Sequence, residues 1–328
     1  MDLKDRRGEG TAVHYWDGLA EVPPGLEPSV VTIGNFDGVH RGHRQVLEHV
    51  VSTARSAGQC AIAITFDPHP RVVHRPNEPQ ESITDLQEKS RLLAQVGLDG
   101  LVVIHYTLEF AQQSPEEFVR NVIVHALHAR TVVVGRDVRF GYRNAGDFDT
   151  MCALGQKYHF DVVPVADYGE DRRCSSTWIR DALRAGDVSE AAGVLGRNHR
   201  VHGEVVHGFA RGRELGFPTA NLSDEVQGMI PADGVYAGWL HEESGRRWPA
   251  AISVGSNPTF DGVSRVVEAH VIDRPHEAVE DFDLYGQQVA VEFVERLRGM
   301  VAFEGIPKLV EQMTDDVDRT RQVLAVPS

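Results

Sequence analysis

Cysteine is scarce in this sequence of 328 residues. Its three thiols, Cys60, Cys152 and Cys174, are widely spaced, and no two of them form a C-x-x-C pair. An odd number of isolated cysteines supports neither a disulfide framework nor a structural zinc site. The chain must therefore be stabilised by hydrophobic cores, and a reducing, cytoplasmic compartment is expected.

Positive charge and long apolar runs are missing as well. Asp and Glu number 48 against 33 Lys and Arg, the formal net charge is −15, and no window is dominated by basic residues. No nucleic-acid partner is therefore expected. No segment approaches the roughly 20 apolar residues that cross a bilayer, and residues 1–10 lack the apolar core of a signal peptide, so no membrane association is expected. Helix N-termini and a few Arg or His side chains can still bind small phosphorylated ligands locally.

The first half of the chain alternates short apolar runs with helical patterns. The runs, rich in β-branched residues, are Val30–Gly34, Ala61–Phe66, Leu101–Ile104, Thr131–Gly135 and Asp161–Val165. Such runs suit strands buried on both faces of a parallel sheet. One helix is expected to end at Gly58 and another to begin after Ser114. The alternation predicts an α/β domain with an open, doubly wound parallel sheet.

The pattern changes near residue 198. Further strands are expected at Val201–His207, Gly234–Leu240, Trp248–Val254, Val266–Asp273 and Gln288–Leu297, followed by one helix at about Pro307–Leu324. This order predicts a small antiparallel β-barrel with a C-terminal helix. The length also favours two domains. We expect the division at 1–187 and 188–328, with the amphipathic stretch Asp181–Arg197 as connector.

A candidate phosphate site follows the first expected strand. The segment Gly34–His43 combines a glycine turn with two histidines at the start of a helix. Three-residue spacing places His40 and His43 on one helical face, beside free backbone amides and the positive end of the helix dipole. Surface capping and zinc binding are alternative explanations of the two histidines. Their position directly after the strand favours phosphate binding.

A second candidate phosphate site is the segment Cys174–Arg180, which follows a strand and opens a helix. Ser176 and Thr177 could simply cap this helix. Arg180 lies three residues after Thr177 on the same face and adds a fixed charge to the hydroxyl and amide donors. Such a group can hold a triphosphate and stabilise the charge on departing pyrophosphate.

The second half contains a different set of polar residues. No GxxxxGK[ST] sequence occurs, which excludes a P-loop kinase. The segment His207–Arg213 reads as a loop and Leu215–Asn221 as a turn, although Thr219 and Asn221 would project to one side of an extended chain and could bind one hard cation. Glu268 lies in an expected strand, where a glutamate usually faces solvent.

Together these segments resemble a known family. The H-x-G-H pattern of His40–His43 and the S-S-T-x-I-R pattern of Ser175–Arg180 are similar to motifs of the nucleotidylyltransferase superfamily. The match narrows to prokaryotic bifunctional riboflavin kinase/FMN adenylyltransferases through further blocks, namely Thr65–Pro70, Ser114–Phe118, Leu127–Ala129 and Val134–Gly141. The resemblance covers about residues 28–325, and the shared order of the motifs is more specific than any single motif.

The resemblance implies two reactions, riboflavin phosphorylation in the second domain and adenylylation of FMN to FAD in the first, with riboflavin, FMN and ATP as substrates and Mg²⁺ as cofactor. The implied catalytic residues are Glu268, His43 and Arg180. The implied ATP and phosphate contacts are Gly34, Phe36, His40, His43, Ser176, Thr177, Arg180, Gly208, Arg211 and Gly212. Asp137, Phe66 and Asn257 would contact flavin, and Thr219 and Asn221 would bind the metal ion.

Two other interpretations remain open. A nucleotidylyltransferase acting on nicotinamide mononucleotide or phosphopantetheine would share the two-histidine site, although the kinase-like half argues against it. The second interpretation is a flavin-binding or regulatory protein in which one or both sites have lost activity. Val138 and Trp178 depart from the family pattern and flank the adenylylation site. The sequence sets no oligomeric state and is compatible with a homo-oligomer.

Overall fold

The chain forms two compact units. The computed structural model describes residues 13–78, 81–169, 172–207, 217, 219–259, 262–272, 284–301 and 303–325. The first unit comprises Met1–Glu81 and Asp85–Ser175, and the second comprises Ser82–Thr84 and Ser176–Ser328. The domain division expected at 187/188 stays a prediction.

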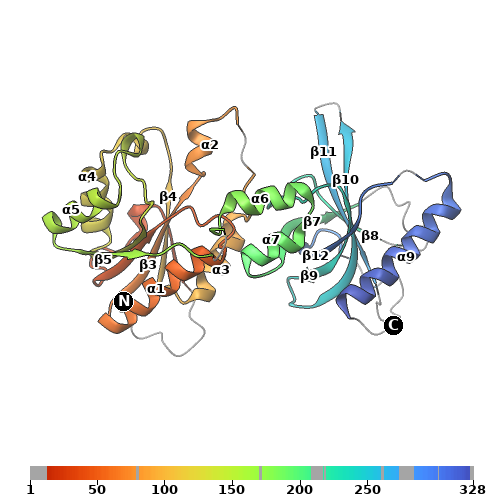
Figure 1. Cartoon of the computed structure of the whole chain (residues 1–328), viewed down its shortest axis with the longest axis horizontal. Helices are drawn as coiled ribbons and strands as arrows, with labels where there is room; N and C mark the ends of the chain where they lie inside the picture. The colour runs from red at the N-terminus through yellow and green to blue at the C-terminus, as the bar shows by residue number, and fades with distance from the viewer. Residues whose placement is uncertain are drawn as a thin grey trace. The chain divides into compact units, whose positions relative to one another are not determined.

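The first unit is built on a parallel sheet of six strands (Figure 1). In chain order the strands are β1 (His14–Asp17), β2 (Ser29–Ile33), β3 (Cys60–Asp67), β4 (Gly100–His105), β5 (Ala129–Gly135) and β6 (Asp161–Val165). All five predicted runs are strands. The sequence did not predict β1, a short polar strand that pairs with β4 at one edge.

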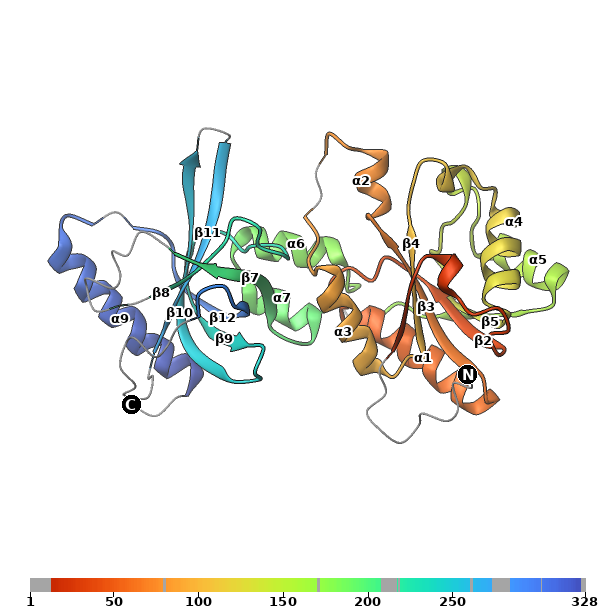
Figure 2. The same ribbon diagram turned by 180° about the vertical axis from the view of Figure 1, so that it is seen from behind.

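Helices cover both faces of this sheet, as the doubly wound prediction requires. On one face, α1 (Arg41–Ala57) and α3 (Leu86–Val96) bury apolar side chains against the strands. On the other, the continuous helical segment α4 (Pro115–Phe118) and η4 (Val119–Ala126) packs together with α5 (Phe148–Tyr158). Figure 2 shows α1 and α3 from behind. A short helix, α2 (Pro70–His74), follows β3.

Local signals fix two helix ends where the sequence predicted them. Gly58 adopts a left-handed conformation after α1, and its amide donates to carbonyls of the last helical turn. Ser114 and Glu117 form a capping box at the start of α4.

The strand order creates one topological switch point. The order is β1-β4-β3-β2-β5-β6, so the chain winds away from β2 in one direction and from β5 in the other. In open α/β sheets, ligands bind beyond the carboxyl ends of the strands at such a point. Gly34 follows β2 and Arg136 follows β5, so both predicted phosphate- and flavin-contacting segments start here.

The second unit contains a closed antiparallel barrel with the order β10-β11-β8-β7-β12-β9. Its strands are β7 (His199–Val206), β8 (Thr219–Leu222), β9 (Gly234–Glu242), β10 (Arg247–Thr259), β11 (Gly262–Val271) and β12 (Gln288–Arg298). The five expected strands are present, and Thr219–Leu222 adds a sixth. The predicted barrel is therefore confirmed.

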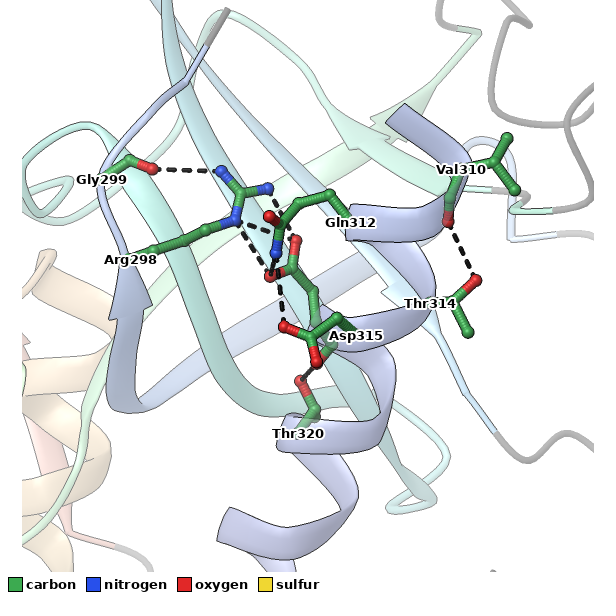
Figure 3. Close-up of polar contacts among 8 residues, drawn as sticks. Arg298, Gly299, Val310, Gln312, Thr314, Asp315 and Thr320 are labelled. Carbon is green, nitrogen blue, oxygen red and sulfur yellow. Dashed lines mark hydrogen bonds and ion pairs between the residues drawn. The ribbon is translucent and has the colours of Figure 1, made fainter. Parts of the chain in front are cut away.

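The C-terminal helix α9 (Ile306–Leu324) packs on the outside of the barrel, where Val323 contacts an apolar cluster of β9 and β12. Arg298, at the end of β12, donates to the buried carboxylate of Asp316 at 3.0 and 2.6 Å, and Gln312 lies beside it (Figure 3). This buried pair fixes the helix in register with the strand.

A second buried carboxylate, Glu292 of β12, lies on the outer side of the same barrel. It accepts hydrogen bonds from Asn198 at 2.8 Å and from Arg200 at 2.7 Å. Burial by itself would raise the pKa of Glu292, but bonds with His241 and Asn198 and the Arg200 charge lower it to about 2. Glu292 is therefore ionised at neutral pH.

Two helices precede the barrel, α6 (Ser176–Ala185) and α7 (Val188–Leu195). The connector predicted as one amphipathic stretch is broken at Gly186, which takes a positive φ of 78°. Leu183 of α6 accepts a hydrogen bond from the Ala232 amide, and Ala185 accepts one from Arg296 of β12. Helix α6 is therefore an integral part of the second unit.

Candidate active sites

The loop between β2 and α1 has an unusual backbone. Phe36 and Val39 have positive φ angles of 47° and 40°, which non-glycine residues rarely adopt. Both side chains are buried, so the strained turn is held by core packing. A side chain at Gly34 would meet the Phe36 ring at 2.9 Å, which explains the glycine there. The loop is therefore built in one fixed conformation.

His40 and His43 lie together at the start of α1. Their rings stack with centroids 3.6 Å apart, and the Phe36 ring meets His43 edge-on at 5.3 Å. The His43 amide donates to Nδ1 of His40 at 3.3 Å. A neutral His40 ring consequently carries its proton on Nε2. The structure thus brings the predicted phosphate-binding histidines together.

The surroundings of His43 favour its neutral form. Burial lowers its pKa well below the usual range, and the positive charges of His40, Lys89 and Arg173 lower it further. Among the described residues, the buried Nδ1 atom of His43 has no hydrogen-bond partner. A polar atom left in this state at a switch point is a site for ligand contact.

Asp137 stands on the β5 side of the switch point. Arg173 donates to its carboxylate at 2.6 Å and also reaches Asp167 at 3.1 Å. A side chain at Gly135 would meet Oδ1 of Asp137 at 2.6 Å, so the glycine leaves room for this carboxylate. Arg173 therefore links Asp137 electrostatically to His43. The sequence offered no signal for Arg173, which lies in a loop outside every motif.

Phe66 and Lys89 also belong to this region. Phe66, predicted to contact flavin, ends β3 in an aromatic cluster, with its ring 5.6 Å from that of Tyr106. Lys89 of α3 is 8% exposed and was missed, because a lysine in a helix normally points to solvent. The sequence feature that could have identified Lys89 is its helical position, next to Glu88 and on the same face as the apolar residues Leu92 and Leu93.

Three predicted phosphate ligands, Ser176, Thr177 and Arg180, lie in the first two turns of α6 in the second unit. Ser176 begins the helix, as expected, and Arg180 is buried. Trp178, one of the departures from the family pattern, donates from its indole nitrogen to Glu190 at 2.8 Å. This bond gives Trp178 a structural role within the second unit.

The outer face of the barrel holds Thr219, Asn221 and Glu268. Thr219 and Asn221 alternate with the buried residues Ala220 and Leu222, so both project outward from β8. Nδ2 of Asn221 donates to Oγ1 of Thr219 at 3.3 Å. Since the amide nitrogen makes this bond, the amide oxygen is the end that can meet a cation. These neighbouring oxygens suit a hard ion such as Mg²⁺.

Glu268 is the direct cross-strand neighbour of Asn221 and faces Ser253 on its other side. Val267 and Ala269 fill the barrel interior, so Glu268 points outward with the two β8 side chains. Burial raises the pKa of Glu268. A carboxylate with a raised pKa is a stronger proton acceptor and suits a general base. The fully solvated alternative for Glu268 is therefore disfavoured.

Four predicted contacts are not placed. Gly208, Arg211 and Gly212 lie outside the described residues. Asn257 lies in β10 opposite Ser264, and only its backbone is described. Their roles remain predictions.

The fold and the two sites define a class of protein, a two-domain transferase acting on phosphate compounds. One domain places a histidine pair at the switch point of a doubly wound sheet, and the other gathers an acid and two polar side chains on the outer face of a barrel. Sequence comparison gives the family. The sequence model for FAD synthetase matches residues 23–178, and that for riboflavin kinase matches residues 195–324. The chain belongs to the bifunctional riboflavin kinase/FMN adenylyltransferase family, whose substrates include a nucleotide.

Relatives match along most of their length. The Escherichia coli (strain K12) bifunctional riboflavin kinase/FMN adenylyltransferase is 33% identical over 299 residues, covering 91% of this chain and 93% of that protein. The Bacillus subtilis (strain 168) protein of the same name is 33% identical over 301 residues, covering 88% and 90%. A crystal structure titled macrolide-efflux protein from Streptococcus pneumoniae is 30% identical, with a TM-score of 0.83 and coverage of 94% and 99%. In the described part of this chain, no helix is long and apolar enough to span a membrane.

Proposed function

We propose that the barrel domain transfers phosphate from ATP to riboflavin, giving FMN, and that the sheet domain adenylylates FMN to FAD with release of pyrophosphate. The observation that carries this proposal is that each unit brings together its own set of polar side chains suited to phosphate contact. His40 and His43 provide one set, and Thr219, Asn221 and Glu268 provide the other.

In the kinase reaction, Glu268 would accept the proton of the ribityl hydroxyl as the oxygen attacks the γ-phosphorus of ATP. The raised pKa of Glu268 supports this role. Thr219 and Asn221 would hold Mg²⁺, since their side-chain oxygens face the same side of β8. When bound, the ion would neutralise phosphate charge.

In the adenylylation reaction, the FMN phosphate is already anionic and needs no base to attack the α-phosphorus. Positioning and charge stabilisation can provide most of the rate. His40 and neutral His43 would donate hydrogen bonds to the triphosphate. Family resemblance assigns Ser176, Thr177 and Arg180 to the same triphosphate, with Asp137 beside the flavin.

The remaining expectations concern the cellular setting. The formal charge of −15 supports small-molecule substrates rather than nucleic acid. The isolated thiols support a reducing cytoplasmic location. A homo-oligomer is compatible with the sequence, and light scattering of the purified protein would determine the oligomeric state.

One assay tests the two activities together. The purified protein is incubated with riboflavin, ATP and Mg²⁺, and riboflavin, FMN and FAD are separated by chromatography. We expect FMN to appear first and FAD to follow. Bound riboflavin without ATP turnover would instead indicate a flavin-binding protein, and FMN without FAD would indicate a different acceptor in the sheet domain. Omission of Mg²⁺ should stop FMN formation.

A further inference from the structure

Lysine is rare in this chain, and one of its lysines is buried. Four of the 33 basic residues are lysines, namely Lys4, Lys89, Lys157 and Lys308. Lys157 and Lys308 lie on the surface and pair with Glu116 and Glu304. Lys89, in contrast, is 8% exposed. A buried lysine is costly unless a partner compensates the lost hydration of its ammonium group.

The described surroundings of Lys89 provide no direct partner. Lys89 lies in the first turns of α3, and no described carboxylate lies within 4.0 Å of its ammonium. Burial lowers its pKa, while the negative charges of Asp37, Asp67 and Asp85 oppose this effect from a greater distance. These carboxylates favour a positive charge on Lys89, but none of them lies at ion-pair distance from its ammonium.

Lys89 is close to the reacting end of the first site. Asp37 follows β2 and Asp67 ends β3, so the groups around Lys89 belong to the carboxyl edge of the sheet. Its charge also acts on His43. The other cation that acts on His43 from outside the histidine pair is Arg173, which is already held by Asp137 and Asp167. Of the two cations that act on His43 from outside the histidine pair, Lys89 is therefore the one with no carboxylate at ion-pair distance among the described residues.

We propose that Lys89 binds a phosphate oxygen of a substrate in the adenylylation site. The inference rests on the proposed function of this domain. The oxyanion can belong to the ATP triphosphate or to the phosphate of FMN, because both must reach this edge of the sheet. A compact ammonium group on a flexible stem suits such a contact, and exclusion of water strengthens it. Lys89 makes and breaks no covalent bond in this role.

Nuclear magnetic resonance of the intact protein tests the contact directly. Protein labelled with ¹³C at the lysine Cε atom gives four lysine signals, and the signal missing from Lys89→Arg identifies Lys89. Pyrophosphate and FMN are added separately, each without the other substrate. We expect the Lys89 signal to shift with one of these probes and the signals of Lys157 and Lys308 to stay in place. A shift with pyrophosphate assigns the contact to the triphosphate, and a shift with FMN assigns it to the flavin phosphate.

Kinetics of full-length Lys89→Gln provide the second measurement. Loss of one preorganised charged donor typically costs on the order of 10²–10³-fold in rate. We expect a loss of this size in FAD formation from FMN, with riboflavin phosphorylation within about threefold of wild type. Lys157→Gln, a surface lysine of the same unit, is the matched control and should lose neither activity. If pyrophosphate shifts the lysine signal, the KM for ATP should rise in Lys89→Gln. If FMN shifts the signal, the KM for FMN should rise.

Several outcomes would overturn the inference. An unmoved Lys89 signal with both probes, in wild-type protein that forms FAD, would refute the contact and leave the proposed function intact. FAD formation by Lys89→Gln within about threefold of wild type would refute it equally. Wild-type protein that forms no FAD would refute the proposed function instead. If Lys89→Gln does not fold, the spectra of the wild type decide the question.

Discussion

Substitution of Glu268 by glutamine separates proton acceptance from packing in the barrel domain. The amide keeps the volume and hydrogen bonding of the carboxylate but cannot accept the substrate proton. A positioned general base usually contributes roughly 10²–10⁴-fold to the rate, so riboflavin phosphorylation should fall by at least about two orders of magnitude. Riboflavin binding and FAD formation from added FMN should be unchanged.

Thermal unfolding of the same variant tests the burial of Glu268 independently of the kinase assay. Burial raises the pKa of Glu268 in the folded state, so the unfolded chain holds its proton less tightly. The free energy of unfolding therefore decreases as pH rises from the pKa of Glu268 in the unfolded chain through its pKa in the folded protein. Glutamine does not ionise, so the variant lacks this pH-dependent decrease in stability. Glu268→Gln should therefore unfold at the same or a higher temperature than the wild type at pH 7. The kinase activity of the wild type should also increase as pH rises through the raised pKa of Glu268. The activity of the variant should not show this increase.

The measurements are kinase turnover by chromatography, flavin binding by fluorescence and unfolding by calorimetry. Glu204→Gln is the matched control, because Glu204 is an exposed glutamate on strand β7 of the same barrel, which pairs with β8. Kinase turnover of Glu268→Gln within about threefold of wild type would refute the base assignment, since that change corresponds to less than about 1 kcal/mol of barrier. A large loss of turnover together with failed flavin binding would point to a structural role.

Three further predictions follow from the two units. His43→Ala should slow FAD formation by about 10²–10³-fold and leave FMN formation intact; equal losses in both assays at an unchanged melting temperature would contradict separate sites. A fragment of residues 176–328 should make FMN but no FAD, and residues 188–328, which lack α6, should do the same at a lower melting temperature; a folded, flavin-binding fragment without FMN production would place the kinase elsewhere. Glu292→Gln should lower the free energy of unfolding by roughly 3 kcal/mol at pH 7, a difference that should shrink as pH falls from the unfolded pKa towards about 2. Exposed Glu243→Gln should change stability by less than about 0.5 kcal/mol, and an equal effect of both would refute the buried network.

The sequence predicted most of the architecture because its strands are strongly patterned. Runs such as Thr131–Gly135 are apolar enough to be buried on both faces, and strands such as β7 and β8 in the second unit alternate between buried and more exposed residues. Strand β1 escaped prediction because His14–Asp17 is only four residues long and mixes polar with aromatic residues. The break between α6 and α7 at Gly186 was also missed, since the apolar pattern continues across it.

The candidate sites were predictable only where chemistry follows a motif. His40 and His43 occupy a recognisable position after a strand, and the structure stacks their rings. Lys89 shares the buried face of its helix with Leu92 and Leu93, but neither it nor Arg173 belongs to a motif, and tertiary folding brings both towards His43. The positive φ angle of Phe36 was equally hidden, because core packing imposes it on a residue type that does not favour it.

The outward position of Glu268 makes the length of strand β11 a constraint on the enzyme. Because side chains alternate along a strand, one inserted residue before Glu268 would turn it into the barrel interior and expose its apolar neighbours. Two inserted residues would restore the outward direction but move Glu268 past Asn221, its partner in β8. Neither change keeps the acid beside the proposed metal ligands. Members of this family should therefore vary in length between the barrel strands and keep the spacing inside β11 constant.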